Sequence, residues 1–107
     1  MDSRIAKTIA FIDKNIEKRV TLKEIAGLSR LSPGYLNALF RKETGLRFGM
    51  YLKEKRIERA RILLANSELE IKDIFILSGY KNIQNFYHDF KKATGATPRA
   101  YQQRTKS

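Results

Sequence analysis

Hydrophobic residues recur at helical spacing along most of the chain, and almost no segment alternates as a half-buried strand does. Near the start, the isoleucines from Ile5 to Ile16 follow one another at steps of four, three and four residues, which places them on one face of a helix over about residues 3–18. Leucines, isoleucines and alanines predict a longer helix over about residues 48–65. The pattern therefore predicts an all-α fold.

Capping residues, prolines and glycines divide the rest of the chain into shorter helices. Thr21 and Asn82 are typical N-caps, and Ser32 is followed by a proline in the first helical position. Gly45 and Gly95 stand where a helix commonly ends in the left-handed conformation. The predicted short helices cover about residues 22–28, 33–44, 72–78 and 83–94, and a last one begins at Thr97–Pro98 and contains Tyr101. The polar tail after it is expected to fray.

An internal repeat organises these helices. The segment Phe40–Gly45 (FRKETG) returns 50 residues later as Phe90–Gly95 (FKKATG), and Tyr51 and Tyr101 keep the same displacement. Each copy is preceded by a short helix and a tight turn, which is the order of a helix-turn-helix. The chain thus predicts two homeodomain-like helix-turn-helix subdomains, residues 1–47 and 67–107, joined by a linker helix over residues 48–66, with about seven helices in all.

The charge favours a polyanionic partner. Lysines and arginines number 22 against 11 aspartates and glutamates, a net charge of +11 on 107 residues. Such an excess is typical of proteins that bind duplex DNA, RNA or an acidic membrane surface. Zero cysteines and a single histidine argue against a metal site, and we expect no cofactor. No export signal or membrane-spanning run is present in the sequence, so a cytoplasmic, nucleoid-associated protein is expected.

The second helix of each unit carries the candidate base-reading residues, because that helix enters the major groove with its N-terminal part against the base edges. In the second unit, Phe86 and Phe90 define the buried face, so the outward positions are Ile83, Gln84, Tyr87 and His88. The equivalent positions of the first unit include Gly34, Asn37 and Ala38. Gln84 and Asn37 have the amide fork that bonds adenine, and Ile83 suits a thymine methyl group.

Basic residues recur where phosphates would run. They are Arg41 and Lys42 in the first unit and Lys91 and Lys92 in the second. A basic pair alone indicates only a solvated helix face, but its recurrence at one place in both repeats favours phosphate contacts. The polar residues at helix starts, Thr21, Ser32 and Asn82, complete the predicted phosphate-binding set.

The length of the linker is compatible with one monomer that reads two sites. A helix of about 18 residues spans roughly 27 Å. Successive major-groove faces lie roughly 34 Å apart. The helices over about residues 32–44 and 82–94 are therefore predicted to occupy successive major grooves.

The chain resembles the DNA-binding domain of the AraC/XylS family of bacterial transcription regulators, from about Ile5 to Gln103. The densest part of the resemblance consists of Ile74, Gly79, Tyr80, Asn85, Phe86, Phe90, Lys91, Lys92, Gly95, Thr97, Pro98 and Tyr101. It implies binding to double-stranded promoter DNA, activation or repression of transcription, and RNA polymerase as a partner. Members of the family usually add a sensor or receiver domain, so the chain is either a piece of a longer regulator or a stand-alone member.

Several positions depart from the family pattern. Phe75 occupies a site that is usually small, where overpacking would cost about 1–3 kcal/mol unless its neighbours adjust. Arg30 stands where a turn glycine is common. Gly34 and Ala38 replace larger or charged residues that often touch bases in relatives. These departures suggest that the second unit reads sequence more actively, while the first mainly grips the backbone.

Other functions find less support. No Ser/His/Asp set can be assembled around His88, and Glu54 and Glu58 alternate with basic residues as solvated ion pairs do, so no catalytic residue is predicted. A non-specific RNA- or polyanion-binding helical module remains the alternative, since charge alone does not distinguish RNA from DNA. A module whose basic face binds an acidic protein is a third.

Overall fold

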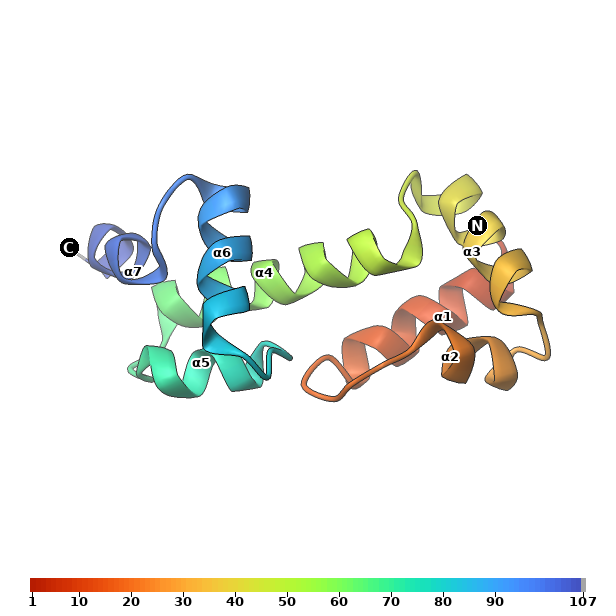
Figure 1. Cartoon of the computed structure of the whole chain (residues 1–107), viewed down its shortest axis with the longest axis horizontal. Coiled ribbons are helices and arrows are strands. Elements are labelled where there is room, and N and C mark those ends of the chain that lie inside the picture. The colour runs from red at the N-terminus through yellow and green to blue at the C-terminus, as the bar shows by residue number, and fades with distance from the viewer. Residues whose placement is uncertain (107) are drawn as a thin grey trace. The chain divides into compact units, whose positions relative to one another are not determined.

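The computed structural model describes residues 1–106, and within them the chain forms helices joined by short turns, without a strand (Figure 1). The helices are α1 (Ser3–Lys14), α2 (Leu22–Leu28), α3 (Pro33–Thr44), α4 (Phe48–Asn66), α5 (Ile71–Leu77), α6 (Ile83–Thr94) and α7 (Pro98–Lys106). The predicted all-α class is confirmed. The helix starts at Leu22, Pro33 and Pro98 fall where the caps and prolines indicate, and α4 starts at Phe48, where its apolar spacing indicates.

Two helix ends differ from the predictions. The first helix ends at Lys14 rather than near residue 18, because the backbone of Asn15 leaves the helical conformation, with φ −118° and ψ 25°. The side-chain amide of Asn15 donates to the Phe11 carbonyl in the last turn. Ile16 is nevertheless buried, in the turn that follows. The C-terminal tail is helical up to Lys106 rather than frayed, and the Lys106 ammonium group donates to the Ser67 carbonyl.

The chain divides into two compact units, Met1–Glu54 and Lys55–Ser107, and the boundary falls inside α4. The first half of α4 contributes Phe48 and Leu52 to the core of the first unit. The second half contributes Ile57, Ala60 and Leu64 to the core of the second unit. One helix therefore supplies apolar side chains to two separate cores.

The core of the first unit lies between α1, α2, α3 and the start of α4. Its buried side chains are Ile5, Ile12, Ile16, Val20, Ile25, Ala26, Leu36, Phe40, Phe48 and Leu52. The core of the second unit consists of Ile57, Ala60, Leu64, Ile74, Phe86 and Phe90. Phe86 and Phe90 are buried as expected, Phe40 and Phe48 are buried in the first unit, and Phe11 packs half-buried against the first core.

The sequence repeat is also a structural repeat. Thr44 Oγ1 donates to the Phe40 carbonyl at 2.8 Å and accepts the Leu46 amide hydrogen at 3.2 Å. In the second unit, Thr94 makes the same two bonds at the same lengths, with the Phe90 carbonyl and the Ala96 amide. The following glycines, Gly45 and Gly95, both adopt positive φ, at 82° and 79°. The ends of α3 and α6 are thus built alike.

The tight turns before α3 and α6 share one conformation but differ in the residue that adopts it. Gly79 has a φ of 94°, and its counterpart Arg30 has a φ of 55°, the one non-glycine residue with positive φ in the described part of the chain. In each turn the next amide donates back to the short helix, Leu31 to the Ala26 carbonyl and Tyr80 to the Phe75 carbonyl. Arg30 therefore adopts a conformation that glycine accepts at lower cost.

Phe75 is accommodated at the border of the second core. Its counterpart in the first unit, Ala26, is buried between the helices, whereas Phe75 is half-buried with its ring centroid 6.3 Å from that of Phe86. The larger side chain thus extends toward the surface instead of overfilling the core. Nearby, Ser78 is fully buried, and its hydroxyl has no hydrogen-bond partner among the described residues.

Candidate nucleic-acid interface

The start of α6 is capped without using the outward face of the helix. Asn82 Oδ1 accepts hydrogen bonds from the Gln84 and Asn85 amides, at 2.8 and 3.1 Å. Phe86 and Phe90 point into the core and are fully buried. The burial of this apolar face fixes which side of α6 meets solvent.

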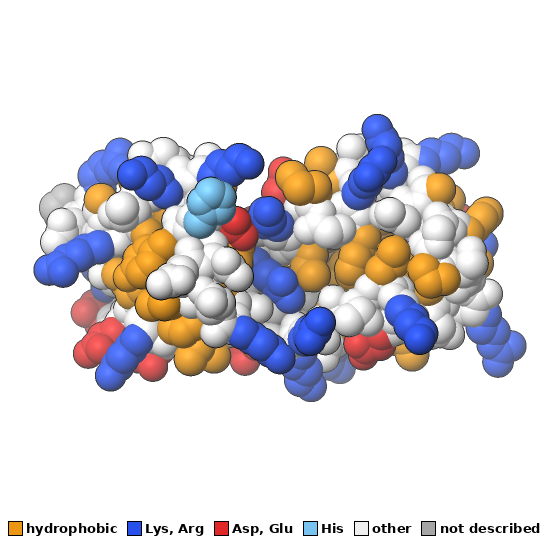
Figure 2. Space-filling model, viewed as in Figure 1, with side chains coloured by type: hydrophobic (Ala, Val, Ile, Leu, Met, Phe, Trp, Pro, Cys, Tyr) orange, Lys and Arg blue, Asp and Glu red, His pale blue; other side chains and the backbone are white. Residues whose placement is uncertain are grey.

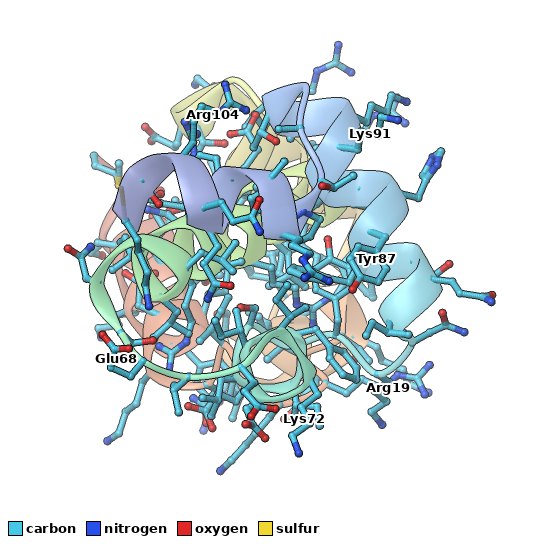
Figure 3. The ribbon with its side chains drawn as sticks, turned by 90° about the vertical axis from the view of Figure 1, so that its left-hand side faces the viewer. Arg19, Glu68, Lys72, Tyr87, Lys91 and Arg104 are labelled. Carbon is cyan, nitrogen blue, oxygen red and sulfur yellow. The ribbon has the colours of Figure 1, made fainter. Side chains whose placement is uncertain are left out.

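Four exposed side chains form a single stripe along that side of α6. Gln84, Tyr87, His88 and Lys91 are spaced at i, i+3, i+4 and i+7, so they lie above one another on the helix. Lys91 projects from α6 into solvent in Figure 3, and His88, the only histidine of the chain, is at the surface with basic side chains beside it in Figure 2. We call these four residues the α6 stripe.

Ile83 differs from the other predicted base-contact residues of α6, because its side chain is half-buried. Tyr87 is 39% exposed, and its ring centroid lies 6.0 Å from that of Phe86, so its side chain is partly covered by the core and partly open to solvent. An amide, a phenol, an imidazole and an ammonium group together offer hydrogen-bond donors and acceptors to base edges and a cation to phosphates.

The corresponding stripe on α3 is poorer in functional groups. Gly34, Ala38 and Arg41 are exposed, but neither Gly34 nor Ala38 carries a polar side chain. Asn37 is half-buried, and its Oδ1 accepts a hydrogen bond from the Phe48 amide at 3.0 Å. The side-chain amide of Asn37, which was expected to face a base, therefore already uses its oxygen in a hydrogen bond to the start of α4.

The four predicted phosphate-binding cations are all exposed. Arg41 and Lys42 lie in the last turn of α3, and Lys91 and Lys92 lie in the last turn of α6. Cations at a helix C-terminus also interact favourably with the helix dipole, which is a stabilising role independent of any ligand. The exposure of these four side chains and their positions in the last turns of α3 and α6 are thus compatible with phosphate contacts in both units.

The predicted polar contacts at the helix starts are all N-caps. Thr21 Oγ1 accepts from the Glu24 amide at 3.1 Å, and Ser32 Oγ accepts from the Tyr35 amide at 3.2 Å. Because each hydroxyl acts as an acceptor in its cap, its own proton remains available to a phosphate oxygen. The same holds for the amide nitrogen of Asn82, whose oxygen makes the cap.

A hydrogen bond between two half-buried side chains beside α6, Tyr80 and Asp89, was not predicted from the sequence. The Tyr80 hydroxyl donates to Asp89 Oδ2 at 2.9 Å, which joins the turn before α6 to the middle of the helix. Burial and this bond to the carboxylate raise the pKa of Tyr80, and burial lowers the pKa of the half-buried Arg56. Asp89 is the single acidic residue of α6, and that solitary acid on a basic helix was the signal available in the sequence.

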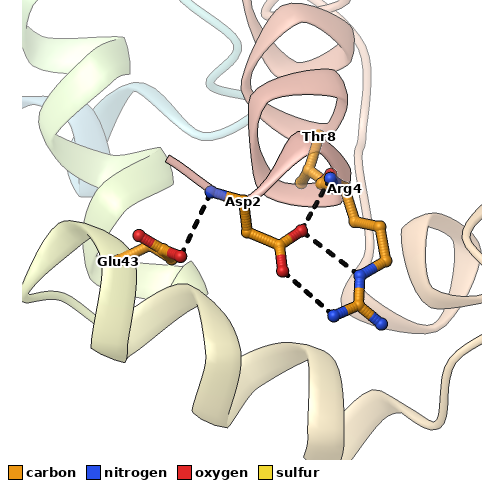
Figure 4. Close-up of polar contacts among 4 residues, drawn as sticks. All are labelled: Asp2, Arg4, Thr8 and Glu43. Carbon is orange, nitrogen blue, oxygen red and sulfur yellow. Dashed lines mark hydrogen bonds and ion pairs between the residues drawn. The ribbon is translucent and has the colours of Figure 1, made fainter.

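A second unpredicted group holds the chain start against α3 (Figure 4). The Asp2 amide donates to Glu43 Oε1 at 3.2 Å, and the Asp2 carboxylate caps α1 through the Arg4 amide at 2.8 Å. Arg4 also pairs with that carboxylate at 3.0 Å and lies over the exposed Tyr35 ring, 5.8 Å from its centroid. The hydrogen bonds from Arg4 hold the pKa of Asp2 at about 2, below its usual 3.8. A cation is thereby placed beside the first turn of α3.

None of the helices within residues 1–106 is both long and apolar enough to cross a bilayer. The same residues hold no cluster of three His, Cys, Asp or Glu side chains suited to a metal ion.

Comparison with known proteins places these features in a family. The sequence model of the family described as "Helix-turn-helix domain" matches residues 25–104. The uncharacterized HTH-type transcriptional regulator YtdP of Bacillus subtilis is 39% identical over 92% of this chain, which spans 13% of that protein. The bifunctional transcriptional activator/DNA repair enzyme AdaA of the same organism is 33% identical over 90% of this chain and 46% of its own length. The chain thus spans less than half of either relative.

Among solved structures, the C-terminal domain of AraT, a response regulator from Geobacillus stearothermophilus, is similar with a TM-score of 0.90 and 31% identity, over 94% of this chain and 84% of that one. Two helix-turn-helix units that share a helix, each with an exposed second helix, define a DNA-binding domain of transcription regulators. The chain belongs to the AraC/XylS family of such domains.

Proposed function

We propose that the chain binds double-stranded promoter DNA sequence-specifically, with α3 and α6 in successive major grooves. The observation that carries this proposal is the α6 stripe: Gln84, Tyr87, His88 and Lys91 stand together on the exposed side of a helix whose opposite side is locked by Phe86 and Phe90. A second helix with this arrangement is the part of a helix-turn-helix that enters the major groove.

The roles within each unit follow from side-chain chemistry. Gln84 suits a bidentate contact with adenine, while Tyr87 and His88 offer further contacts to base edges, with Ile83 at the margin of the site. The exposed cations Arg41, Lys42, Lys91 and Lys92 bind phosphates, assisted by the caps Thr21, Ser32 and Asn82. Arg4, beside the first turn of α3, joins the phosphate-binding set of the first unit.

The helix α4 acts in this proposal as the linker between two reading units, residues 1–47 and 67–107. Its 19 residues span about 28 Å. Successive major-groove faces on one side of a duplex lie roughly 34 Å apart. This length supports contact of one monomer with two neighbouring half-sites.

The setting of this activity also belongs to the proposal. Because the curated relatives are much longer than this chain, we infer that it works together with a sensor or receiver domain. A transcription regulator acts where the promoter DNA lies, so the proposal places it in the cytoplasm, on the nucleoid, with RNA polymerase as a further partner. AdaA combines a transcriptional activator with a DNA repair enzyme. We assign no catalytic step to the present segment, whose role is DNA binding.

Selection of bound duplexes from a randomised DNA pool, at physiological salt and with structured RNA as competitor, tests the proposal. We expect enrichment of two short boxes whose centres are about 10–10.5 bp apart. Absence of enrichment together with effective competition by RNA would contradict it and favour a general polyanion-binding module. Enrichment of a single box would retain sequence-specific binding and reject the use of both units by one monomer.

A further inference from the structure

The first turn of α4 depends on a side chain from another helix. The first amide groups of a helix have no partner within it and need an acceptor from a cap, water or elsewhere. Arg47 occupies the cap position, since its carbonyl accepts the Tyr51 amide hydrogen at 3.0 Å, but its side chain has no oxygen to serve as a cap. The Phe48 amide instead donates to Asn37 Oδ1, which belongs to α3, at 3.0 Å.

The equivalent helix of the second unit needs no such help. A displacement of 50 residues pairs Arg47 and Phe48 with Thr97 and Pro98. Thr97 Oγ1 accepts the Ala100 amide hydrogen at 3.1 Å, and Pro98 has no amide hydrogen to satisfy. The start of α7 is thus self-sufficient.

The same displacement pairs Asn37 with Tyr87, and the two side chains have different tasks. Asn37 is half-buried and bonded to the backbone of α4, whereas Tyr87 is 39% exposed on the α6 stripe. Since α7 starts with its own cap, the position of Tyr87 is free of any structural duty toward the next helix. The same helical position therefore has a structural role in the first unit, through Asn37, and is available for DNA contact in the second, through Tyr87.

We propose that Asn37 is a positioning residue, which holds α3 against the start of α4 and takes no part in base discrimination, and that Gln84, Tyr87 and His88 of α6 carry most of the base discrimination of this domain. This inference rests on the proposed function. With Asn37 so engaged, the outward positions of α3 are left with Gly34 and Ala38, which have no polar side chain, and with Arg41. The first unit then contributes mainly affinity through contacts with the DNA backbone, and its box is selected more weakly than the box of α6.

Asn37→Asp separates the two roles of the side chain. Aspartate keeps an oxygen at the position that accepts the Phe48 amide hydrogen, but it has no N–H with which to contact a base. We expect Asn37→Asp to retain slow hydrogen exchange at the Phe48 amide and to select the same base at every position as the wild type, with a uniform loss of affinity from the added negative charge. Asn37→Ala removes the acceptor, and exchange at Phe48 should become about tenfold faster.

Gln84→Ala is the matched control, because it truncates an exposed amide of the α6 stripe and should relax the base preference at one position. All selections are made below the thermal transition of the least stable variant. A changed preference at a single base pair in Asn37→Asp would overturn the proposal, and so would equal protection of the Phe48 amide in the wild type and Asn37→Ala. If the wild type itself selected no sequence, both the proposed function and base discrimination by α6 would be rejected. Hydrogen exchange at the Phe48 amide would still test the positioning role of Asn37 separately.

Discussion

The ring of Tyr101 packs edge-on against the ring of Phe90, with centroids 5.4 Å apart and ring planes at 82°. Tyr51 meets Phe40 with the same interplanar angle and a centroid distance of 4.8 Å. Edge-to-face pairs of this kind are favourable beyond the area they bury. Each of the helices α3 and α6 is thus fixed at its buried side to the helix that follows, which sets the direction in which its exposed side points.

Gln84→Ala is expected to relax sequence preference at one base pair. The exposed amide is lost, while the Asn82 cap, which uses only the Gln84 backbone amide, stays intact. Discrimination at that base pair should fall by about 1–3 kcal/mol. Binding to single-substituted operators measures it, and a uniform loss over all operators would contradict a base contact.

Lys91→Ala is expected to weaken binding to all sequences alike and to lower the slope of log affinity against log salt by about 0.9. Lys106→Ala serves as the control, because it removes the same charge from a side chain that already pairs with Glu68 at 3.9 Å. Titrations at several salt concentrations measure both slopes. An altered base preference in Lys91→Ala with an unchanged slope would show that Lys91 does not bind a phosphate.

Arg30→Gly is expected to stabilise the protein by about 0.5–1 kcal/mol. Arg30 has a φ of 55°, a strained conformation for a residue with a side chain, and this relief outweighs the extra backbone entropy that glycine loses on folding. Urea denaturation measures the change. Gly79→Arg, which makes the opposite exchange in the second turn, should be destabilising, and a loss of stability in Arg30→Gly would show that the arginine side chain makes a compensating contact.

Ser78→Ala is expected to raise the free energy of unfolding by about 1–3 kcal/mol, the cost of burying an unbonded hydroxyl group. The Ser78 hydroxyl is buried and has no hydrogen-bond partner among the described residues. Ser29→Ala is the matched control, since Ser29 is the counterpart in the first unit and is only half-buried. A destabilised Ser78→Ala would mean that an ordered water satisfies the hydroxyl group.

The ion pair of Asp2 should make stability depend on pH in the acid range. The folded-state pKa of Asp2, at about 2, lies below the ordinary value of 3.8, so its contribution is complete above about pH 4 and is lost as the pH falls through 2. Asp2→Asn keeps an N-cap but removes the charge. The stability difference between wild type and variant should therefore shrink between pH 4 and pH 2, as measured by urea denaturation, and a constant difference over that range would contradict the pairing with Arg4.

The fold was largely predictable from the sequence because its signals are local. The caps at Thr21, Ser32 and Asn82 and the left-handed glycines, Gly45 and Gly95, act within one turn of a helix, and all five adopt the predicted roles. The spacing of the isoleucines predicts a later end of α1 than the structure has, because Ile16 continues the helical spacing although it reaches the same core from a turn. The periodicity of apolar residues predicts which side chains are buried. A buried side chain such as that of Ile16 can also lie in a turn after the helix has ended.

The site was less predictable because its contacts join distant residues. The exposure of Gln84, Tyr87 and His88 followed from the buried positions of Phe86 and Phe90 on the same helix. The bond from Phe48 to Asn37 depends on how two helices meet, and no pattern within either helix reveals it. The only trace in the sequence is the replacement of Thr97–Pro98 by Arg47–Phe48 at the same place in the repeat.

The division of α4 between two cores limits how this protein can be cut or recombined. A fragment that stops at residue 47 lacks Phe48 and Leu52, and one that starts at residue 67 lacks Ile57, Ala60 and Leu64. Neither fragment retains the interior it needs, although both contain a complete helix-turn-helix. Exchange of reading units between relatives should therefore succeed at junctions within α4, near Glu54 and Lys55, and fail at the ends of the helix.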